Sequence, residues 1–398
     1  MAKGNTWFRR KQVNSRMTRE KPHQLMVLRS LQFASNSMYS LLVVCIPLYF
    51  EALGFSRLEI GSVYAMGPLM AIVSNLLLGF IADKAKNIRL LLGILFLCQI
   101  AVFLALSPLR QFAAITALMA AFYFFQAPAI PMVDSLSLLA SERLGRSFAS
   151  IRVFGSIGFA LCAVFFGYLY AEIGSPMVVP AGCLTAAAAL LFIPFLGNFQ
   201  ANLRRFDFGE LWEILKQRRT VLFFVLVWFV AVPHRVNESF LSLRMQEVGG
   251  EELVGWLWLT SSVSEIPMML LLARVGHRLK ELPLLSAAAF FYMVRMLLMS
   301  ASDSPWAILA ISLMHSVTFG IFFVTAMRFL THLLPDQFRA TGQAVFVTVW
   351  VGFSGLLTGP LAGWLYDTFG ASAPFLVGAG TALTAAVGFL YAHVRGYS

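Results

Sequence analysis

The sequence predicts an all-α membrane protein with twelve transmembrane helices in two halves of six. Three observations lead to this fold class. The chain is 59% hydrophobic and 12% charged, which lies outside the range of soluble globular domains. Apolar runs longer than the ~18 residues that a membrane-spanning helix needs recur along the whole length. The longest polar interruption after the N-terminal segment, residues 198–218, separates six of these runs from six others.

Each predicted span is an apolar run that ends at polar, basic or turn residues. The spans of the first half are 25–50, 59–82, 89–107, 109–139, 151–172 and 175–197. The spans of the second half are 219–244, 252–273, 282–301, 304–333, 340–366 and 370–394. The expected domains are a basic tail, 1–24, a six-helix bundle, 25–197, a central loop, 198–218, a second six-helix bundle, 219–394, and a short C-terminus, 395–398.

Basic residues predict the orientation of these helices. They fall in the N-terminal tail and in every second loop, as the positive-inside rule describes, while the opposite loops carry only Arg57, Arg110 and Arg244. We therefore expect a multi-pass protein of the cell membrane with both termini in the cytoplasm. The basic residues on the expected cytoplasmic side are Lys84, Lys86, Arg89, Arg143, Arg146, Arg204, Arg205, Lys216, Arg218, Arg219, Arg274, Arg278, Lys280 and Arg339.

The net charge of +11 does not indicate nucleic-acid binding. Such binding would need aromatic side chains interleaved with basic ones in a solvated groove, and the sequence shows no such pattern. The basic first segment orients the helices, and it could also bind anionic lipid headgroups. Arg9 and Arg10 are not followed by a cleavable pattern, so we expect no removed signal peptide.

Motifs of catalysis, metal binding and ion conduction do not stand out. The four cysteines show no CxxC pair or metal-ligand spacing, so we expect reduced structural thiols and no metal. No Ser/His/Asp spacing, phosphate loop or HExxH motif indicates an enzyme, and no filter-like segment indicates a channel. Two six-helix halves instead favour a transporter with its site near the bilayer midplane, between the halves. The cysteines are Cys45, Cys98, Cys162 and Cys183.

Two charged residues are predicted to lie deep in the first half. Asp134 lies nine residues before Arg143 in the loop between spans four and five, and Arg152 lies nine residues after it. Antiparallel helices joined there would bring both side chains to a depth of up to ~13 Å, near the middle of a ~30 Å hydrocarbon core. Because either charge alone would be costly at that depth, we expect an ion pair.

The second half carries ionisable residues at a similar depth. Arg295 lies about ten residues before the centre of the loop "SASDSP", and His315 lies about ten residues after it. Glu265 lies roughly ten residues before the turn near Val275, and Pro267 should weaken its helix locally. With the pair of the first half, these groups form either satisfied pairs that fix helix register or a binding site with a proton relay. Intramembrane ionisable groups favour the second reading.

The seventh span carries a further polar cluster in "VAVPHRVNESF". Its residues could line the same cavity or cap a solvated helix end, and both readings stay open. The cluster consists of His234, Arg235, Asn237 and Glu238.

Small residues in the eleventh span predict close helix packing. Gly355, Gly359 and Gly363 recur every four residues, a spacing that lets another helix approach closely. Pro360 beside them marks an expected kink.

Several motifs resemble the major facilitator superfamily. The stretch "GFIADKAKNIR", with Gly79, Asp83 and Lys84, resembles the signature loop between the second and third helices of that superfamily, and "TGPLAGWLYDTFG" is similar to its eleventh helix. The resemblance implies that the carboxylate and bases of this loop gate the protein by locking its two halves in one state. The corresponding loop of the second half, "LARVGHRLKEL", lacks the matching acid.

Within the superfamily, the fifth span resembles the lactose-permease branch. The stretch "SIRVFGSIGFALCA" matches the fifth helix of that branch, including Cys162. The resemblance implies that Arg152 binds a sugar and that Asp134 takes the place of its partner carboxylate. Phe159 replaces the tryptophan that stacks on galactose, which departs from the galactoside pattern.

The second half matches that branch in part. Arg295 and His315 fall on its ninth-helix arginine and tenth-helix histidine, and Glu265 lies about one turn from its eighth-helix glutamate. Thr318 occupies the place of the proton-carrying glutamate, and Ser312 that of a nearby lysine. The resemblance therefore implies proton coupling by a different route.

Other stretches look more like the phenylpropionate-permease branch, which implies an aromatic carboxylate as cargo. They are "PMVDSLSL", "RVFGSIGF" and "LMHSVTFGIFFVTAMRF". The antiporter signature GPxxGG is absent from the fifth span, which makes drug export the less favoured activity.

The function that follows is secondary active transport of a small polar organic solute by proton symport and alternating access. The cargo is a sugar or an aromatic carboxylic acid. The proton is the coupling ion, no other cofactor is expected, the remaining partners are membrane lipids, and we expect a monomer.

The alternatives are a proton-driven exporter or lipid flippase on the same fold, and a membrane sensor, which would need a soluble domain. We expect substrate binding by Asp134, Arg152, Phe159 and Arg295, and proton coupling by Glu265, His315 and Asp134.

Overall fold

The computed structural model describes residues 4–84, 88–144, 148–197, 216–334 and 339–397, and within these ranges all regular secondary structure is helical. Every predicted span overlaps one helix or consecutive helices, although several ends differ. The helices of the first half are α1 Gly4–Val44, α2 Ile46–Ala52, α3 Arg57–Lys84, α4 Ile88–Leu106, α5 Phe112–Gln126, α6 Ala129–Leu144, α7 Ala149–Ile173 and α8 Val178–Phe192. Those of the second half are α10 Arg218–Glu247, α11 Val254–Val275, α12 Glu281–Ala301, α13 Pro305–Ser312, α14 Ile321–Leu333, α15 Arg339–Val347, α16 Ser354–Phe369 and α17 Ser372–Val394.

Short helical turns complete several of these spans. Two of them, η5 Ser316–Gly320 and η7 Thr348–Phe353, are π-helical. The others are the 3₁₀ turns η1 Ser175–Met177, η2 Ile193–Phe195, η3 Glu251–Leu253 and η4 Gly276–Arg278.

Nine helices in the described ranges are long and apolar enough to cross a membrane, and ten are if the bent pair α1–α2 is taken as one span. The chain is thus a multi-pass membrane protein. The predicted spans at α3 and α11 are also helical, over Arg57–Lys84 and Val254–Val275. The apolar run of α11 contains the polar residues Ser261, Ser262, Ser264 and Glu265. Pro267 lies inside α11 without ending it.

Four predicted spans are interrupted rather than straight. The first bends by 40° at Cys45, between α1 and α2. The fourth breaks before Pro128, which has no N–H to continue the hydrogen-bond ladder of α5. The tenth and eleventh contain the π-helical turns η5 and η7, a distortion that often occurs at functional sites. These breaks place His315, directly before η5, and Trp350, within η7, at irregular points of the backbone.

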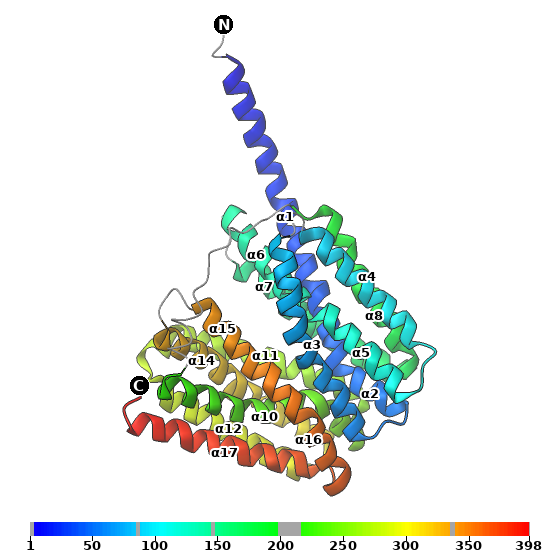
Figure 1. The fold of residues 1–398 in the computed structure, drawn as a ribbon, viewed down its shortest axis with the longest axis vertical. Coiled ribbons are helices and arrows are strands. Elements are labelled where there is room, and N and C mark those ends of the chain that lie inside the picture. Colours follow the sequence, from blue (N-terminus) through cyan, green and yellow to red (C-terminus); the bar gives the residue numbers. More distant parts are fainter. Residues whose placement is uncertain (1–3, 85–87, 145–147, 198–215, 335–338, 398) are drawn as a thin grey trace.

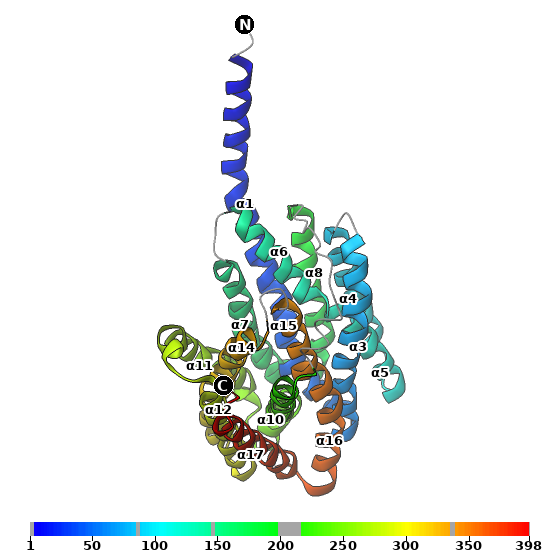
Figure 2. The ribbon, with the colours of Figure 1, turned by 60° about the vertical axis from the view of Figure 1, so that its left-hand side comes forward.

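The helices of each half lie together in space (Figure 1). In the first half α1 packs on α7, α8 and α6, and in the second half α17 packs on α12 and α10. Figure 2 shows α1 projecting beyond all other helices, because it begins at Gly4 rather than near the predicted residue 25. The central loop falls largely on residues 198–215, outside the described ranges, so the domain division at 198–218 stays a prediction.

The two halves meet most closely at one end of the molecule. We call it the Arg57 end, because Arg57 begins α3 there and contacts Glu247 at the end of α10. Here α3 packs along α16, and α7 packs along α11. The predicted role of the glycines in α16 is confirmed, because Gly359 lies against the backbone of Gly61 and Gly363 against that of Arg57. The third, Gly355, lies against Pro68.

Gly359→Val is expected to open the Arg57 end. A Cβ at Gly359 would overlap the carbonyl oxygen of Gly61, so the two helices would have to separate at a cost of about 2 kcal/mol. The distance between spin labels at Ser107 and Glu252, both exposed at this end and on different halves, would measure the change by electron-spin resonance. Gly380→Val is the matched control, because a Cβ there meets nothing within 4 Å. An unchanged distance distribution in Gly359→Val would contradict the expectation.

Candidate functional site

The ion pair predicted for the first half is present. Arg152 Nε on α7 lies 3.2 Å from Asp134 Oδ1 on α6, and both side chains are about one third exposed. Gln32 Nε2 on α1 donates to Asp134 Oδ1 at 2.7 Å and lies 3.1 Å from Ser137 Oγ. Asn36 Nδ2, one turn along α1, donates to the carbonyl oxygen of Gln32. Three helices therefore hold one carboxylate–guanidinium pair in place.

Glycines on α7 allow α1 to approach this pair. A Cβ at Gly155 would overlap both the Arg152 guanidinium and the Asn36 amide, and a Cβ at Gly158 would overlap the backbone of Phe33. The motif "RVFGSIGF" thus combines a charged residue with the small residues that let the polar face of α1 pack against it. Arg29 extends the same face, since its guanidinium lies over the Phe154 ring and its Nε donates to the Ser150 carbonyl oxygen.

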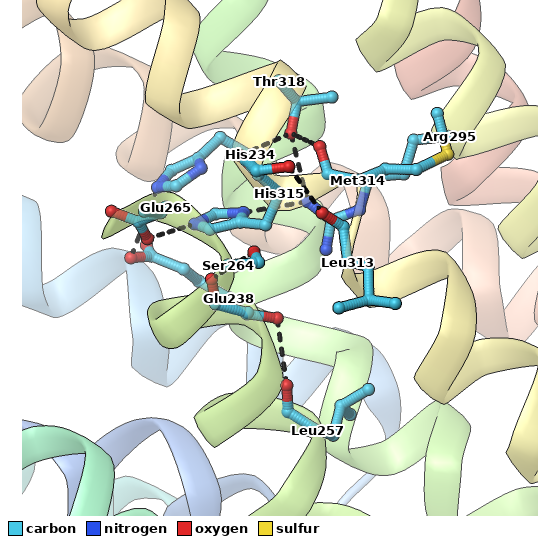
Figure 3. Close-up of polar contacts among 12 residues, drawn as sticks. His234, Glu238, Leu257, Ser264, Glu265, Arg295, Leu313, Met314, His315 and Thr318 are labelled. Atoms are coloured by element: carbon cyan, nitrogen blue, oxygen red, sulfur yellow. Dashed lines mark hydrogen bonds and ion pairs between the residues drawn. The ribbon is translucent and has the colours of Figure 1, made fainter. Parts of the chain in front are cut away.

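The second half contains a chain of three ionisable groups. Arg295 Nη1 on α12 lies 2.9 Å from His315 Nδ1, and His315 Nε2 lies 2.9 Å from Glu265 Oε1 on α11. Figure 3 shows His315 between the other two. A guanidinium can only donate, so Nδ1 of the neutral imidazole must accept, and Nε2 carries the hydrogen that it donates to Glu265. Thr318 Oγ1 lies 3.5 Å from the same Arg295 nitrogen.

Arg295 is the largest fully buried side chain in the described ranges, with a relative exposure of 1%. A charge removed from water so completely needs compensating groups. His315 Nδ1 and Thr318 Oγ1 are the partners of its Nη1. Its Nε is buried without a hydrogen-bond partner among the described residues. The site therefore keeps one donor of a buried cation available.

A second buried chain on α10 runs beside the first. His234 is stacked on His315, with ring centroids 5.9 Å apart and an interplanar angle of 19°. His234 Nδ1 lies 3.2 Å from Tyr292 Oη, and His234 Nε2 lies 3.6 Å from Glu238 Oε1. Glu238 also forms an ion pair with Arg235 of the same helix. His234 of this cluster stacks on His315, and His234 and Asn237 are buried, so the cluster is not a solvated helix end.

Tyr39 connects this chain to the first half. Its hydroxyl on α1 donates to Glu238 Oε1 at 2.7 Å. Its ring lies 5.9 Å from that of Phe159 on α7, which in turn lies 6.4 Å from that of Trp258 on α11. Phe159, expected to contact substrate, thus belongs to an aromatic row at the boundary between the halves.

Sequence reasoning missed the polar residues of α1. Gln32 contacts Asp134, Tyr39 contacts Glu238, and Asn36 donates to Gln32, but the prediction included none of these three residues. The signal was present in "SLQFASNSMYS", where polar side chains recur at intervals of three and four within an apolar span. The predicted gating residues Gly79, Asp83 and Lys84 lie in the last turns of α3, and their side chains fall outside what the structure describes.

An ion-pair network closes the Arg57 end. Arg57 contacts Glu51 on α2 and Glu247 on α10, and its guanidinium lies over the Tyr366 ring of α16. The Tyr366 hydroxyl donates to Glu247. Asp367, which follows on α16, accepts the backbone N–H groups of Arg57 and Leu58 at 3.0 and 2.8 Å. One arginine therefore ties two helices of the first half to two of the second.

The described residues hold no group of three or more His, Cys, Asp and Glu side chains that could bind a metal ion. All four cysteines are free. The carboxylates and imidazoles of the site can form hydrogen bonds and can exchange protons.

The sequence profile of the MFS_1 like family matches residues 26–377. The chain belongs to this family of the major facilitator superfamily. Maltose permease of Geobacillus stearothermophilus is 27% identical over 352 residues, which cover 86% of this chain and 87% of that protein. The probable 3-phenylpropionic acid transporter of Escherichia coli (strain K12) is 22% identical over 327 residues, 81% of this chain and 86% of that protein.

Solved structures show the same fold. The crystal structure of the nucleoside transporter NupG is similar with a TM-score of 0.80 at 19% identity, over 92% of this chain and 98% of that one. The predicted fold class, an all-helical major facilitator fold, is confirmed. This MFS_1 like protein is accordingly a secondary transporter of small solutes and not an enzyme.

Proposed function

We propose that this transporter is a proton symporter for a neutral, hydroxylated organic solute such as a sugar or a nucleoside. Asp134 and Arg152 bind the solute from the first half, with Arg295 from the second and Phe159 beside them. Glu265 and His315 carry the coupled proton, with Asp134 as a further candidate. In this proposal the basic loops lie in the cytoplasm, the Arg57 end faces outward, and solute moves inward.

The observation that carries the proposal is a pair of polar networks, one in each half, with α1 in contact with the first and with Glu238 beside the second. The first is built on Asp134 and Arg152, and the second on Arg295, His315 and Glu265. On α1, Gln32 contacts the first network, and Tyr39 contacts Glu238 beside the second. These two α1 residues lie seven positions apart, about 10 Å along a helix. A small organic solute bound between the networks would reach both halves, as alternating access requires.

The charge pairing supports a neutral cargo. Arg152 already faces Asp134, Arg235 faces Glu238, and Arg295 faces Glu265 through His315. An anionic solute would have to displace one of these carboxylates, whereas hydroxyl groups can bond to carboxylate and guanidinium together. The relative named as a maltose permease supports this choice, and the relative named as a 3-phenylpropionic acid transporter is the reason to test an aromatic acid beside it.

Solute-dependent proton flux tests the proposal. The purified protein would be reconstituted in liposomes that enclose a pH-sensitive dye, and maltose, uridine and 3-phenylpropionate would be added outside. Acidification of the lumen with maltose or uridine is the expected result. Acidification with 3-phenylpropionate alone would replace the neutral cargo by an aromatic acid, and flux in the opposite sense would replace uptake by export.

Asp134→Asn is expected to weaken binding of a neutral solute by about 10- to 100-fold, because one charge-assisted hydrogen bond is lost. An aromatic acid would instead bind equally well or more tightly, because Arg152 loses its carboxylate partner and becomes available. Equilibrium binding of labelled solute measures the difference. Ser137→Ala, which removes a neutral contact of Gln32 in the same network, is the matched control. Unchanged or stronger binding in Asp134→Asn would overturn the neutral-solute assignment.

A further inference from the structure

We propose that Glu238 is a second proton-binding residue of this transporter and that it couples protonation to opening of the Arg57 end through Tyr39. This inference rests on the proton symport proposed above and names the contact through which the proton acts. Neither residue belongs to the solute or proton groups assigned so far.

Glu238 accepts a hydrogen bond from the opposite half of the protein, deep in the bundle. Tyr39 lies on α1 and Glu238 on α10, and their oxygens are 2.7 Å apart. Glu238 lies nine residues before Glu247, so it is about 13 Å along α10 from the Arg57 network. A cavity that opens from the Arg57 end to the central site must therefore separate Tyr39 from Glu238.

The ionised form of Glu238 favours the arrangement seen here. Its carboxylate has three partners: the Arg235 guanidinium, the Tyr39 hydroxyl and the His234 ring at 3.6 Å. Opening would leave the Arg235 pair intact, because both residues lie on α10, and would remove the Tyr39 donor. A proton on Glu238 reduces that loss, since a neutral acid accepts a weaker hydrogen bond than a carboxylate. By linkage, proton binding favours the open form and closure favours proton release.

The proton balance of the cycle follows. In the open form, one carboxylate oxygen of Glu238 takes a proton from water at the Arg57 end. On closure, the Tyr39 O–H donates to that carboxylate, and the Glu238 proton leaves to water in the cavity on the other side. Tyr39 keeps its own proton throughout.

Other titratable groups face Glu238 and must be separated from it in a test. Phenol groups ordinarily titrate near pH 10, so the tyrosines stay neutral between pH 5 and 8. Two histidines, His234 and His315, can change charge in that range. The tyrosines are Tyr39 on α1, Tyr64 on α3, Tyr123 on α5 and Tyr292 on α12, and the charged groups are Arg235 on α10, Arg295 on α12 and Glu265 on α11.

The test measures opening of the Arg57 end against pH without any solute. The full chain, with its four cysteines replaced by serine, would carry spin labels at Ser107 and Glu252. In the parent protein we expect the open population to rise relative to the closed one as the pH falls from 8 to 5. The rise is at most about tenfold, the factor that a hydrogen bond to a charged group contributes once Glu238 is protonated in the open form. Glu238→Gln and Tyr39→Phe should each remove most of this pH dependence.

Ser242→Ala is the matched control. Ser242 Oγ on α10 donates to the Val43 carbonyl oxygen of α1 at 2.9 Å, so its loss weakens the same helix contact without changing a titratable group. It should shift the equilibrium equally at both pH values and leave the pH dependence in place.

The outcomes separate this inference from the proposed function. A Glu238→Gln protein that keeps the full pH response would overturn the inference and assign the response to the histidines or Glu265. A parent protein without pH response whose liposomes still acidify with maltose or uridine would overturn the inference and leave symport standing. A pH response that depends on Glu238 and Tyr39 supports the inference even when no tested solute carries protons.

Discussion

Glu265→Gln should abolish accumulation of solute against a gradient while labelled solute still exchanges across the membrane. The glutamine oxygen can accept the hydrogen of His315 Nε2 as the carboxylate does at 2.9 Å, so the geometry of the chain is kept and only the charge is lost. Arg295 then carries a charge that no acid in its chain balances, as if the site were permanently protonated. The loaded transporter can cycle, whereas the empty one cannot return in its neutral form.

We expect net uptake to fall on the order of 100-fold, the scale of a coupling free energy of 1–3 kcal/mol. Dye-loaded liposomes would measure proton entry, and exchange of labelled solute at equal concentrations on both sides would measure the remaining cycle. Ser264→Ala, which removes only a hydroxyl bonded to its own helix, is the control on the neighbouring position. Loss of exchange together with uptake would show instead that Glu265 is needed for solute binding or folding.

Arg57→Gln should shift the protein toward the form that is open at the Arg57 end. The change removes the two contacts of Arg57 that join the halves, the ion pair with Glu247 and the stacking on Tyr366, whereas the ion pair with Glu51 lies within the first half. The groups are partly exposed, with the Arg57 side chain at 14% and the two glutamates at 26% and 28%, so solvent screens part of their attraction. A net loss of about 2 kcal/mol, or roughly 30-fold in the equilibrium, remains.

The spin-label distance between Ser107 and Glu252 would show this shift as a larger open population at constant pH. Asp303→Asn provides the control, because Asp303 pairs with Arg244 inside the second half and links no helix of the first. It should leave the distance distribution unchanged. Equal effects of the two substitutions would mean that Arg57 stabilises the helices generally and does not hold the halves together.

Spacing along the chain predicted the central contacts because the depth of a side chain in the membrane depends mainly on the number of residues that separate it from the end of its helix. Helices rise by about 1.5 Å per residue and must begin and end at the bilayer surfaces, so charges equally far from a loop reach the same depth. Equal spacing from a loop predicted that Asp134 lies beside Arg152 and that Arg295 lies beside His315. In the structure Arg152 Nε lies 3.2 Å from Asp134 Oδ1, and Arg295 Nη1 lies 2.9 Å from His315 Nδ1. The cost of an unpaired charge in hydrocarbon supplied the expectation of pairing.

Rotation about the helix axis and contacts between distant helices did not follow from residue counts. Glu265 and His315 meet because α11 turns its polar face toward η5, and Glu238 meets Tyr39 across 199 positions of sequence. Helix interruptions were also missed. The breaks at Cys45 and Pro128 and the π-helical turns depend on local backbone geometry that a count of apolar residues does not register.

Among the described residues, the two polar networks and the α10 cluster hold one guanidinium for each carboxylate, so these six charges sum to zero. The carboxylates are Asp134, Glu238 and Glu265, and the guanidiniums are Arg152, Arg235 and Arg295. In the proposed symport, an empty site therefore crosses the bilayer without moving net charge. A bound proton with a neutral solute makes the loaded form positive, and a membrane voltage of 100 mV then acts on it with about 2.3 kcal/mol. With a carboxylate solute the loaded form would be neutral, and the voltage would do no work on it.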